Sequence, residues 1–153
     1  MTFVRFPIAA TILAFALTAS AQERKIERSA LPAAVEKAIQ AETKGATIKG
    51  FAQEREHGKT FYEVETVLDG RTRDILFAPD GTIAEIEEEV PFDALPAGVQ
   101  AGLKKKAGGA NIEKVESLTK KGRLVAYEGH IKSNGKDAEI QVGPDGKNLA
   151  HEE

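Results

Sequence analysis

The residues in this sequence most able to do chemistry are three histidines and many carboxylates. The chain has 24 Asp and Glu, three His and no Cys, and the lack of Cys excludes disulfides, thiolate metal sites and cysteine nucleophiles. His130 lies two positions after Glu128, so on a strand both side chains project from one face, where Glu139 of a neighbouring strand can join them. Glu128, His130 and Glu139 could together bind a cation. The alternative is that they belong to the solvated outer face of the sheet, which has the same composition.

Other patterns of catalytic or metal-binding residues are missing from the sequence. His57 stands in a predicted hairpin and His151 in the C-terminal tail, and the His-x-x-x-His spacing of helical zinc sites does not occur. No Ser lies in a Gly-x-Ser-x-Gly elbow. Glu63 and Glu65 are expected to point away from the core, where nothing would raise a carboxyl pKa for acid–base work. We therefore expect no catalytic residue, no cofactor, no dedicated metal site and no enzymatic activity.

The first 21 residues have the organisation of a secretory signal. Arg5 precedes an apolar run over residues 6–19, and Ala19-Ser20-Ala21 offers small residues where a signal peptidase cleaves. The run is shorter than the ~20 residues needed to span a bilayer. We expect cleavage after Ala21, a periplasmic or secreted location and no stable membrane insertion of the mature chain. The basic residues just after the run leave an uncleaved anchor as the alternative.

The remainder of the sequence repeats itself. Leu31-Pro32-Ala33-Ala34-Val35 returns as Leu95-Pro96-Ala97-Gly98-Val99, and Pro79-Asp80-Gly81 returns as Pro144-Asp145-Gly146. Landmarks between them recur in the same order, with one inserted residue. The sequence therefore predicts a signal peptide over residues 1–21, a first repeat over 22–90 and a second over 91–153.

Each repeat has a helical pattern followed by strand patterns. Leu31, Val35 and Ile39 form one apolar helical stripe. Alternation of apolar and acidic residues over 61–68 indicates a half-buried strand, and Asp69-Gly70 is a hairpin turn signal. We predict an α+β fold of two tandem repeats, each one helix plus a four-stranded antiparallel meander, with the helices packed on one face of the sheet.

The predicted core combines the helical stripe and one strand face of each repeat. It consists of Leu31, Val35, Ile39, Tyr62, Val64, Ile75, Phe77, Leu95, Val99, Leu103, Tyr127, Ile131, Ile140 and Val142. The second predicted helix also contains Gly98 and Gly102, which lower helix propensity. We interpret them as weakening that helix, with close approach of a neighbouring backbone as the alternative.

These landmarks resemble the PepSY-like, β-lactamase-inhibitor-like (BLIP-like) repeat of exported bacterial proteins. They are Leu-Pro-x-x-Val at each predicted helix start, Gly-Ala-x-Ile after the helix, a Tyr-Glu pair followed by Gly, and Pro-Asp-Gly, together covering about residues 29–149. The resemblance implies a secreted or periplasmic tandem domain without an assigned activity. In the namesake inhibitors an open concave sheet face grips a partner enzyme, but no inhibitory loop motif is present here.

The outer face of the sheet is the surface through which we expect the protein to act. If helices cover the inner face, the other face stays open to solvent. The residues expected on it are Phe61, Glu63, Glu65, Asp74, Glu128, His130, Lys132, Glu139 and Gln141. Because most of its charges are acidic, binding there would be electrostatically steered.

Two hypotheses about function follow. The first is an exported, non-enzymatic binding or inhibitor-like module, monomeric, whose partner is a protein or peptide of the cell envelope. The alternative is an envelope metal- or cation-binding protein that uses outward carboxylates and His130. A formal net charge of −3 gives no reason to expect nucleic-acid binding.

Overall fold

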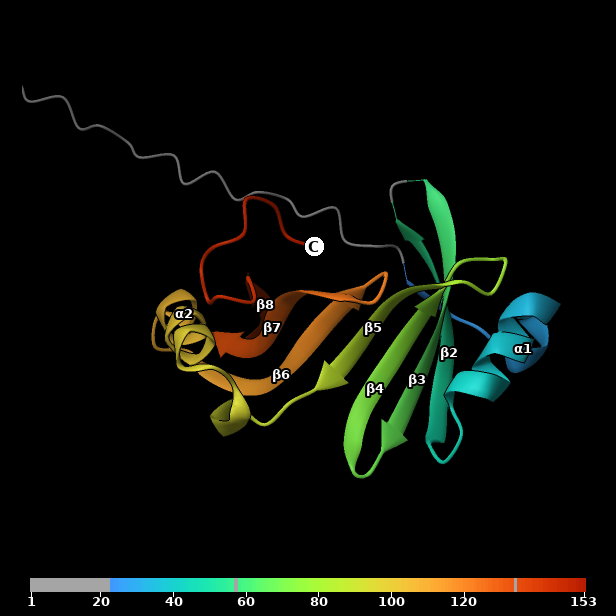
Figure 1. Cartoon of the computed structure of the whole chain (residues 1–153), viewed down its shortest axis with the longest axis horizontal. Coiled ribbons are helices and arrows are strands. Elements are labelled where there is room, and N and C mark those ends of the chain that lie inside the picture. The colour runs from blue at the N-terminus through green and yellow to red at the C-terminus, as the bar shows by residue number, and fades with distance from the viewer. Residues whose placement is uncertain (1–22, 57, 134) are drawn as a thin grey trace, which may run out of the picture.

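The computed structural model describes residues 23–56, 58–133 and 135–153, so the predicted signal peptide and His57 lie outside the described residues. One antiparallel sheet of eight strands, in sequential order, carries two α-helices near its two ends (Figure 1). The elements are β1 (Arg24–Lys25), α1 (Ala33–Glu42), β2 (Thr47–Glu56), β3 (Lys59–Leu68), β4 (Arg71–Phe77), β5 (Ile83–Glu89), α2 (Ala97–Ala107), β6 (Asn111–Lys120), β7 (Arg123–Ser133) and β8 (Lys136–Val142). In these described ranges, neither helix has the length and apolar character needed to cross a membrane.

The prediction of two repeats, each with its own four-stranded meander, is wrong. Helix α1 is followed by four strands but α2 by only three, and β5 pairs with β6, so that the sheet is continuous. The one strand that belongs to neither of these sets is β1, which precedes α1 and pairs with β2. Beyond Val142 the described chain turns at residues 144–146 and contains only one large apolar residue, Leu149, so a further strand would have little to bury. The boundary at residues 90 and 91 stays a prediction.

The pairing of β5 with β6 has a simple physical cause. Two separate meanders would each expose edge strands with unpaired backbone N–H and C=O groups. Pairing of β5 with β6 gives hydrogen-bond partners to the backbone groups at one edge of each meander, over five residue pairs from Glu85–Lys120 to Glu89–Glu116. The glutamates of β5 therefore lie inside the sheet and not on a solvated edge.

The turn signals read from the sequence are confirmed where the structure describes them. Asp69 and Gly70 connect β3 to β4 with φ angles of 51° and 82°, as a two-residue hairpin with left-handed residues requires. The backbone N–H of Gly81 donates to the carbonyl of Ala78, and that of Gly146 donates to the carbonyl of Gly143, at 2.9 and 2.8 Å. The two Pro-Asp-Gly segments thus form equivalent turns.

The glycines of α2 serve close packing. A Cβ at Gly102 would overlap the carbonyl oxygen of Gly146, and one at Gly98 would lie 3.0 Å from the carbonyl oxygen of Asp145. The helix therefore rests directly on the backbone of the turn that follows β8. The interpretation that these glycines only weaken the helix is wrong, and the alternative of close backbone approach is confirmed.

Apolar side chains form one core cluster under each helix. Val35 and Ile39 of α1 pack on Val64, Ile75 and Phe77 of β3 and β4, all of them fully buried. The second cluster consists of Leu95, Val99, Leu103, Val115 and Val142. Most predicted core residues are buried, while Leu31, Tyr62, Tyr127 and Ile140 are half-buried and pack against these clusters. Because both clusters lie on one side of the continuous sheet, both helices cover that side.

Truncation of a core residue tests this arrangement. We expect Ile75→Ala to lower the free energy of unfolding by about 2–5 kcal/mol, because it removes fully buried methylene groups and leaves a cavity. Leu68→Ala, at the half-buried end of β3, is the matched control and should cost about 1 kcal/mol or less. Urea denaturation of both variants measures the difference. A loss near zero at Ile75 would show that this strand face is not the core.

Candidate functional site

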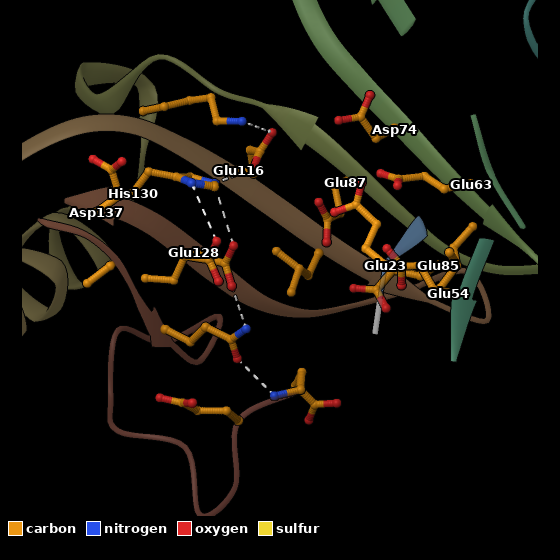
Figure 2. Close-up of a pocket in the computed structure, with 18 of the residues that line it drawn as sticks. Glu23, Glu54, Glu63, Asp74, Glu85, Glu87, Glu116, Glu128, His130 and Asp137 are labelled. Atoms are coloured by element: carbon orange, nitrogen blue, oxygen red, sulfur yellow. Dashed lines mark hydrogen bonds and ion pairs between the residues drawn. The ribbon is translucent and has the colours of Figure 1, made fainter. Parts of the chain in front are cut away.

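The side of the sheet opposite the helices carries a broad hollow of about 1560 Å³, which we call the acidic face (Figure 2). Strand alternation creates it, because the neighbours of the core residues along each strand must point to the other side. Three Lys and one His accompany 15 carboxylates: Glu23, Glu54, Glu56, Glu63, Glu65, Asp74, Glu85, Glu87, Glu113, Glu116, Glu128, Asp137, Glu139, Glu152 and Glu153. A surface of this composition attracts positively charged groups.

Eight of the nine residues expected on the open face line this hollow. They are Glu63, Glu65, Asp74, Glu128, His130, Lys132, Glu139 and Gln141. Phe61 lies instead in a smaller apolar pocket next to the hollow. The prediction that this face binds a partner stays a prediction.

Sequence reasoning missed several residues of the acidic face. Glu85 and Glu87 were not among the residues expected on this face, but β5 is an interior strand and places both in the hollow. Glu116 and Lys114 of β6 complete it. The available signal for β6 was the short alternation of Lys114, Val115 and Glu116, which Ser117 and Leu118 interrupt.

Strand register places three carboxylates directly beside one another. Glu65 of β3 pairs with Asp74 of β4, which pairs with Glu87 of β5. The next position across, on β6, is Leu118, so the row ends at an apolar side chain. Among the described residues, no Lys, Arg or His lies within ion-pair distance of these three carboxylates. Like charges directly opposite one another are unfavourable, and no ion pair with a described residue offsets them in this row.

The pKa values of the carboxyl groups on this part of the face reflect the same deficit. Burial, reinforced by the charges of Glu54 and Asp74, raises the pKa of Glu63 to about 8. Burial, reinforced by Glu85 and Glu116, raises the pKa of Glu87 to about 9. Both groups therefore hold a proton at neutral pH, in place of a positive partner.

The neighbouring part of the acidic face, around Glu116, is neutralised by its own side chains. Glu116 is 1% exposed, and its two oxygens contact His130 Nε2 at 2.6 Å and Lys114 Nζ at 2.7 Å (Figure 2). Thr72 Oγ1 adds a third hydrogen bond at 3.1 Å. Burial acts to raise the pKa of Glu116, but the bonds from His130 and Lys114 outweigh it and lower the pKa to about 2. The hydrogen bond with Glu116 in turn raises the pKa of His130, against a smaller effect of burial.

Glu128 differs from the outward, solvated carboxylate that the sequence suggested. It is 7% exposed, and Gln141 Nε2 donates to its Oε2 at 2.7 Å. Gln141 Oε1 accepts from the backbone N–H of Glu153 at 2.8 Å, which ties the end of the chain to the sheet. Burial raises the pKa of Glu128, against the hydrogen bond from Gln141. Reversing its charge would therefore disturb folding as well as binding.

Three groups of side chains on this face could hold a metal ion. In each group the ligand atoms lie within 4.8 Å of one another, and the groups are Glu116, Glu128 and His130; Glu23, Glu63 and Glu65; and Asp74, Glu87 and Glu116. A cation at the first group would have to displace the proton of His130 and compete with Lys114 for Glu116. All three groups are built from hard oxygen donors, and the first adds the imidazole of His130, a combination that suits several divalent ions.

A single antiparallel sheet backed by helices on one side, with the other side open, places the chain in the BLIP-like class of folds. It superposes on a BLIP-like protein of Bacteroides fragilis with a TM-score of 0.54 and 20% identity, over 78% of this chain and 83% of that one. A DUF2874 family protein of Bacteroides ovatus gives 0.59 and 15%, over 78% and 84%. A Bacteroides eggerthii protein described as periplasmic gives 0.61 and 16%, over 76% and 84%.

At these identities the similarity establishes the fold, and it confirms the BLIP-like resemblance drawn from the sequence landmarks. No family model matches the chain, and no curated protein is similar to it in sequence. The descriptions of the three structures name no enzymatic activity and no partner.

Proposed function

We propose that this protein is an exported, non-enzymatic binding module of the periplasm that captures a positively charged segment of a protein or peptide on its acidic face. The row of Glu65, Asp74 and Glu87, which no cation neutralises among the described residues, is the observation that carries the proposal. Structural neighbours described as BLIP-like and as periplasmic support the class and the location.

A bound Lys or Arg would supply what this row lacks. An ammonium or guanidinium group between Asp74 and Glu87 gives Asp74 a positive partner and lets Glu87 release its proton. A bound cation would be stabilised less around Glu116, because Lys114 and His130 already neutralise the charge of this carboxylate. We therefore place the contact on β3, β4 and β5.

Titration with a fluorescent oligolysine peptide tests this proposal. We expect saturable binding that weakens with added salt, and a loss of about tenfold in affinity for the triple variant Glu63→Gln/Glu65→Gln/Glu87→Gln. Each ion pair contributes up to about 1 kcal/mol in this half-open setting, and ~1.4 kcal/mol corresponds to tenfold. Fluorescence anisotropy at low and physiological salt measures both effects.

A matched control replaces the same number of carboxyl groups elsewhere. Glu27, Glu42 and Asp93 are exposed and lie outside the hollow, so Glu27→Gln/Glu42→Gln/Asp93→Asn should keep the affinity of the wild type. An equal loss in both triple variants would mean that net charge alone attracts the peptide. Absence of binding by the wild type would contradict the proposed function.

Cation binding is a second candidate function. It is favoured by the ligand atoms of Glu116, Glu128 and His130, which lie within 4.8 Å of one another. Calorimetry with zinc and calcium chloride on the wild type and on His130→Ala separates the two candidates. Binding at low metal concentration that His130→Ala abolishes would support this second function, and no heat with either ion would exclude it at this group.

A further inference from the structure

An apolar pocket of about 490 Å³ continues the acidic face at one end. Phe61 near the start of β3, Leu76 near the end of β4, and Ile83 and Ala84 at the start of β5 line it. Leu76 and Glu85 line both the pocket and the acidic hollow, so the two are continuous. No second layer covers this side of the sheet in the described residues, and Phe61 and Leu76 remain half-buried.

Local backbone geometry opens the pocket. The register between β4 and β5 shifts between Leu76 and Phe77, which leaves Ala84 as an extra residue opposite this step. Small side chains at Ala78 and Ala84 then leave space beside the ring of Phe61. A mostly apolar pocket of this volume with polar groups at its edge has the character of a binding site.

Resting on the proposed function, we infer that this pocket receives one bulky apolar side chain of the same cationic segment, bound in an extended conformation. Charge complementarity with the acidic face selects a basic segment as the occupant. Leu76 stands two residues from Asp74 on β4, a separation of about 7 Å, which is also the rise of two residues in an extended peptide. Side chains at positions i and i+2 of such a peptide share one face.

The preferred partner therefore carries Lys or Arg two residues from Phe, Leu or Ile. The outer rim of the pocket bears the exposed Lys59 and Lys121, which disfavour further basic residues beyond the apolar one. The charges on the two sides of the pocket thus set the direction in which the segment lies: its basic residues lie beside Asp74 and Glu87, and its apolar residue ends the contact in the pocket.

Two capped, fluorescently labelled octapeptides test this inference. They share the same lysines and differ only in Phe or Ala two residues after a Lys. We expect the wild type to bind the Phe peptide about tenfold or more tightly than the Ala peptide, because the pocket removes the ring from water. Phe61→Ala/Leu76→Ala should bind both peptides equally, with the affinity of the wild type for the Ala peptide.

The control is Val67→Ala, a truncation on the same strand at a half-buried position outside both hollows, which should keep the preference for Phe. Equal affinity of the wild type for the two peptides would overturn the inference, and this arm does not depend on how well the double variant folds. A preference that persists in the folded double variant would also overturn it. Salt-dependent binding of the Ala peptide in either case upholds the proposed function, whereas no binding of either peptide contradicts both.

Discussion

The free energy of unfolding should fall by more than about 4 kcal/mol between pH 5 and pH 9, and Glu63→Gln/Glu87→Gln should remove most of that fall. The pKa of Glu63 is raised to about 8 and that of Glu87 to about 9, from an ordinary value of 4.5. Above pH 4.5 the unfolded chain ionises at both positions while the folded protein keeps its protons. Rising pH therefore favours the unfolded state until both folded pKa values have been passed.

Other groups on the same face act in the same direction. Burial raises the pKa of Glu54, Asp74, Glu85 and Glu128, and the raised pKa of His130 means that its stabilising charge is lost as the pH rises through that value. A smaller fall should therefore remain in the double Gln variant. Burial of a neutral amide at both positions keeps the shape of the side chains and removes the ionisation.

Urea denaturation of the protein at pH 5, 7 and 9 measures this prediction. Glu27→Gln/Glu42→Gln is the matched control, because it removes two exposed carboxylates far from the hollow and should follow the wild type. If the wild type is as stable at pH 9 as at pH 5, or if the double variant falls in parallel with it, the carboxyls of the acidic face are not held in their neutral form.

Glu116→Gln should lower the free energy of unfolding by about 2–4 kcal/mol at pH 6, because it leaves two cations beside a neutral amide. Lys114 and His130 both lose a partner at 2.7 Å or less, and each is about one-third exposed, so water recovers part of the loss. The pKa of His130 should drop toward its ordinary value, since its hydrogen bond with Glu116 is the main cause of the rise.

The pH window of this contribution follows from the two pKa shifts. Glu116, with a folded pKa of about 2, stabilises the protein above pH 4.5, and this effect is lost as the pH falls from 4.5 toward 2. His130 stabilises it below about pH 6.5, and this effect is lost as the pH rises through its raised pKa. The wild type and variant should therefore differ most between these limits.

Titration of the His130 ring by NMR, together with urea denaturation, checks this second prediction. Glu113→Gln is the control, because Glu113 is exposed on the same strand and makes no ion pair with a described residue. An unchanged pKa of His130 in Glu116→Gln would contradict the role of this carboxylate, even if the variant is destabilised. A changed pKa without loss of stability would show that the network orders side chains only.

The local pattern of the sequence was sufficient to predict most helices and strands and much of the composition of the open face. Alternation over residues 61–68 and the Asp69-Gly70 turn determine that Glu63, Glu65 and Asp74 share one side of a hairpin, because side-chain direction on a strand depends only on position. The apolar stripe of α1 likewise identifies Val35 and Ile39 as core residues. These features involve neighbours in the chain, and short-range geometry decides them.

Pairing between distant segments was decided only by the tertiary structure. The match of β5 with β6, which sets Glu89 opposite Glu116, satisfies two strand edges that local periodicity cannot assign to each other. Burial of Glu116 and the opposite pKa shifts of Glu116 and Glu87 follow from that pairing, because desolvation and charge proximity depend on which strands become neighbours. The need for Gly98 and Gly102 in α2 has the same origin. A helix needs glycine where another backbone comes within contact distance. Only the packing of the whole chain determines where that occurs.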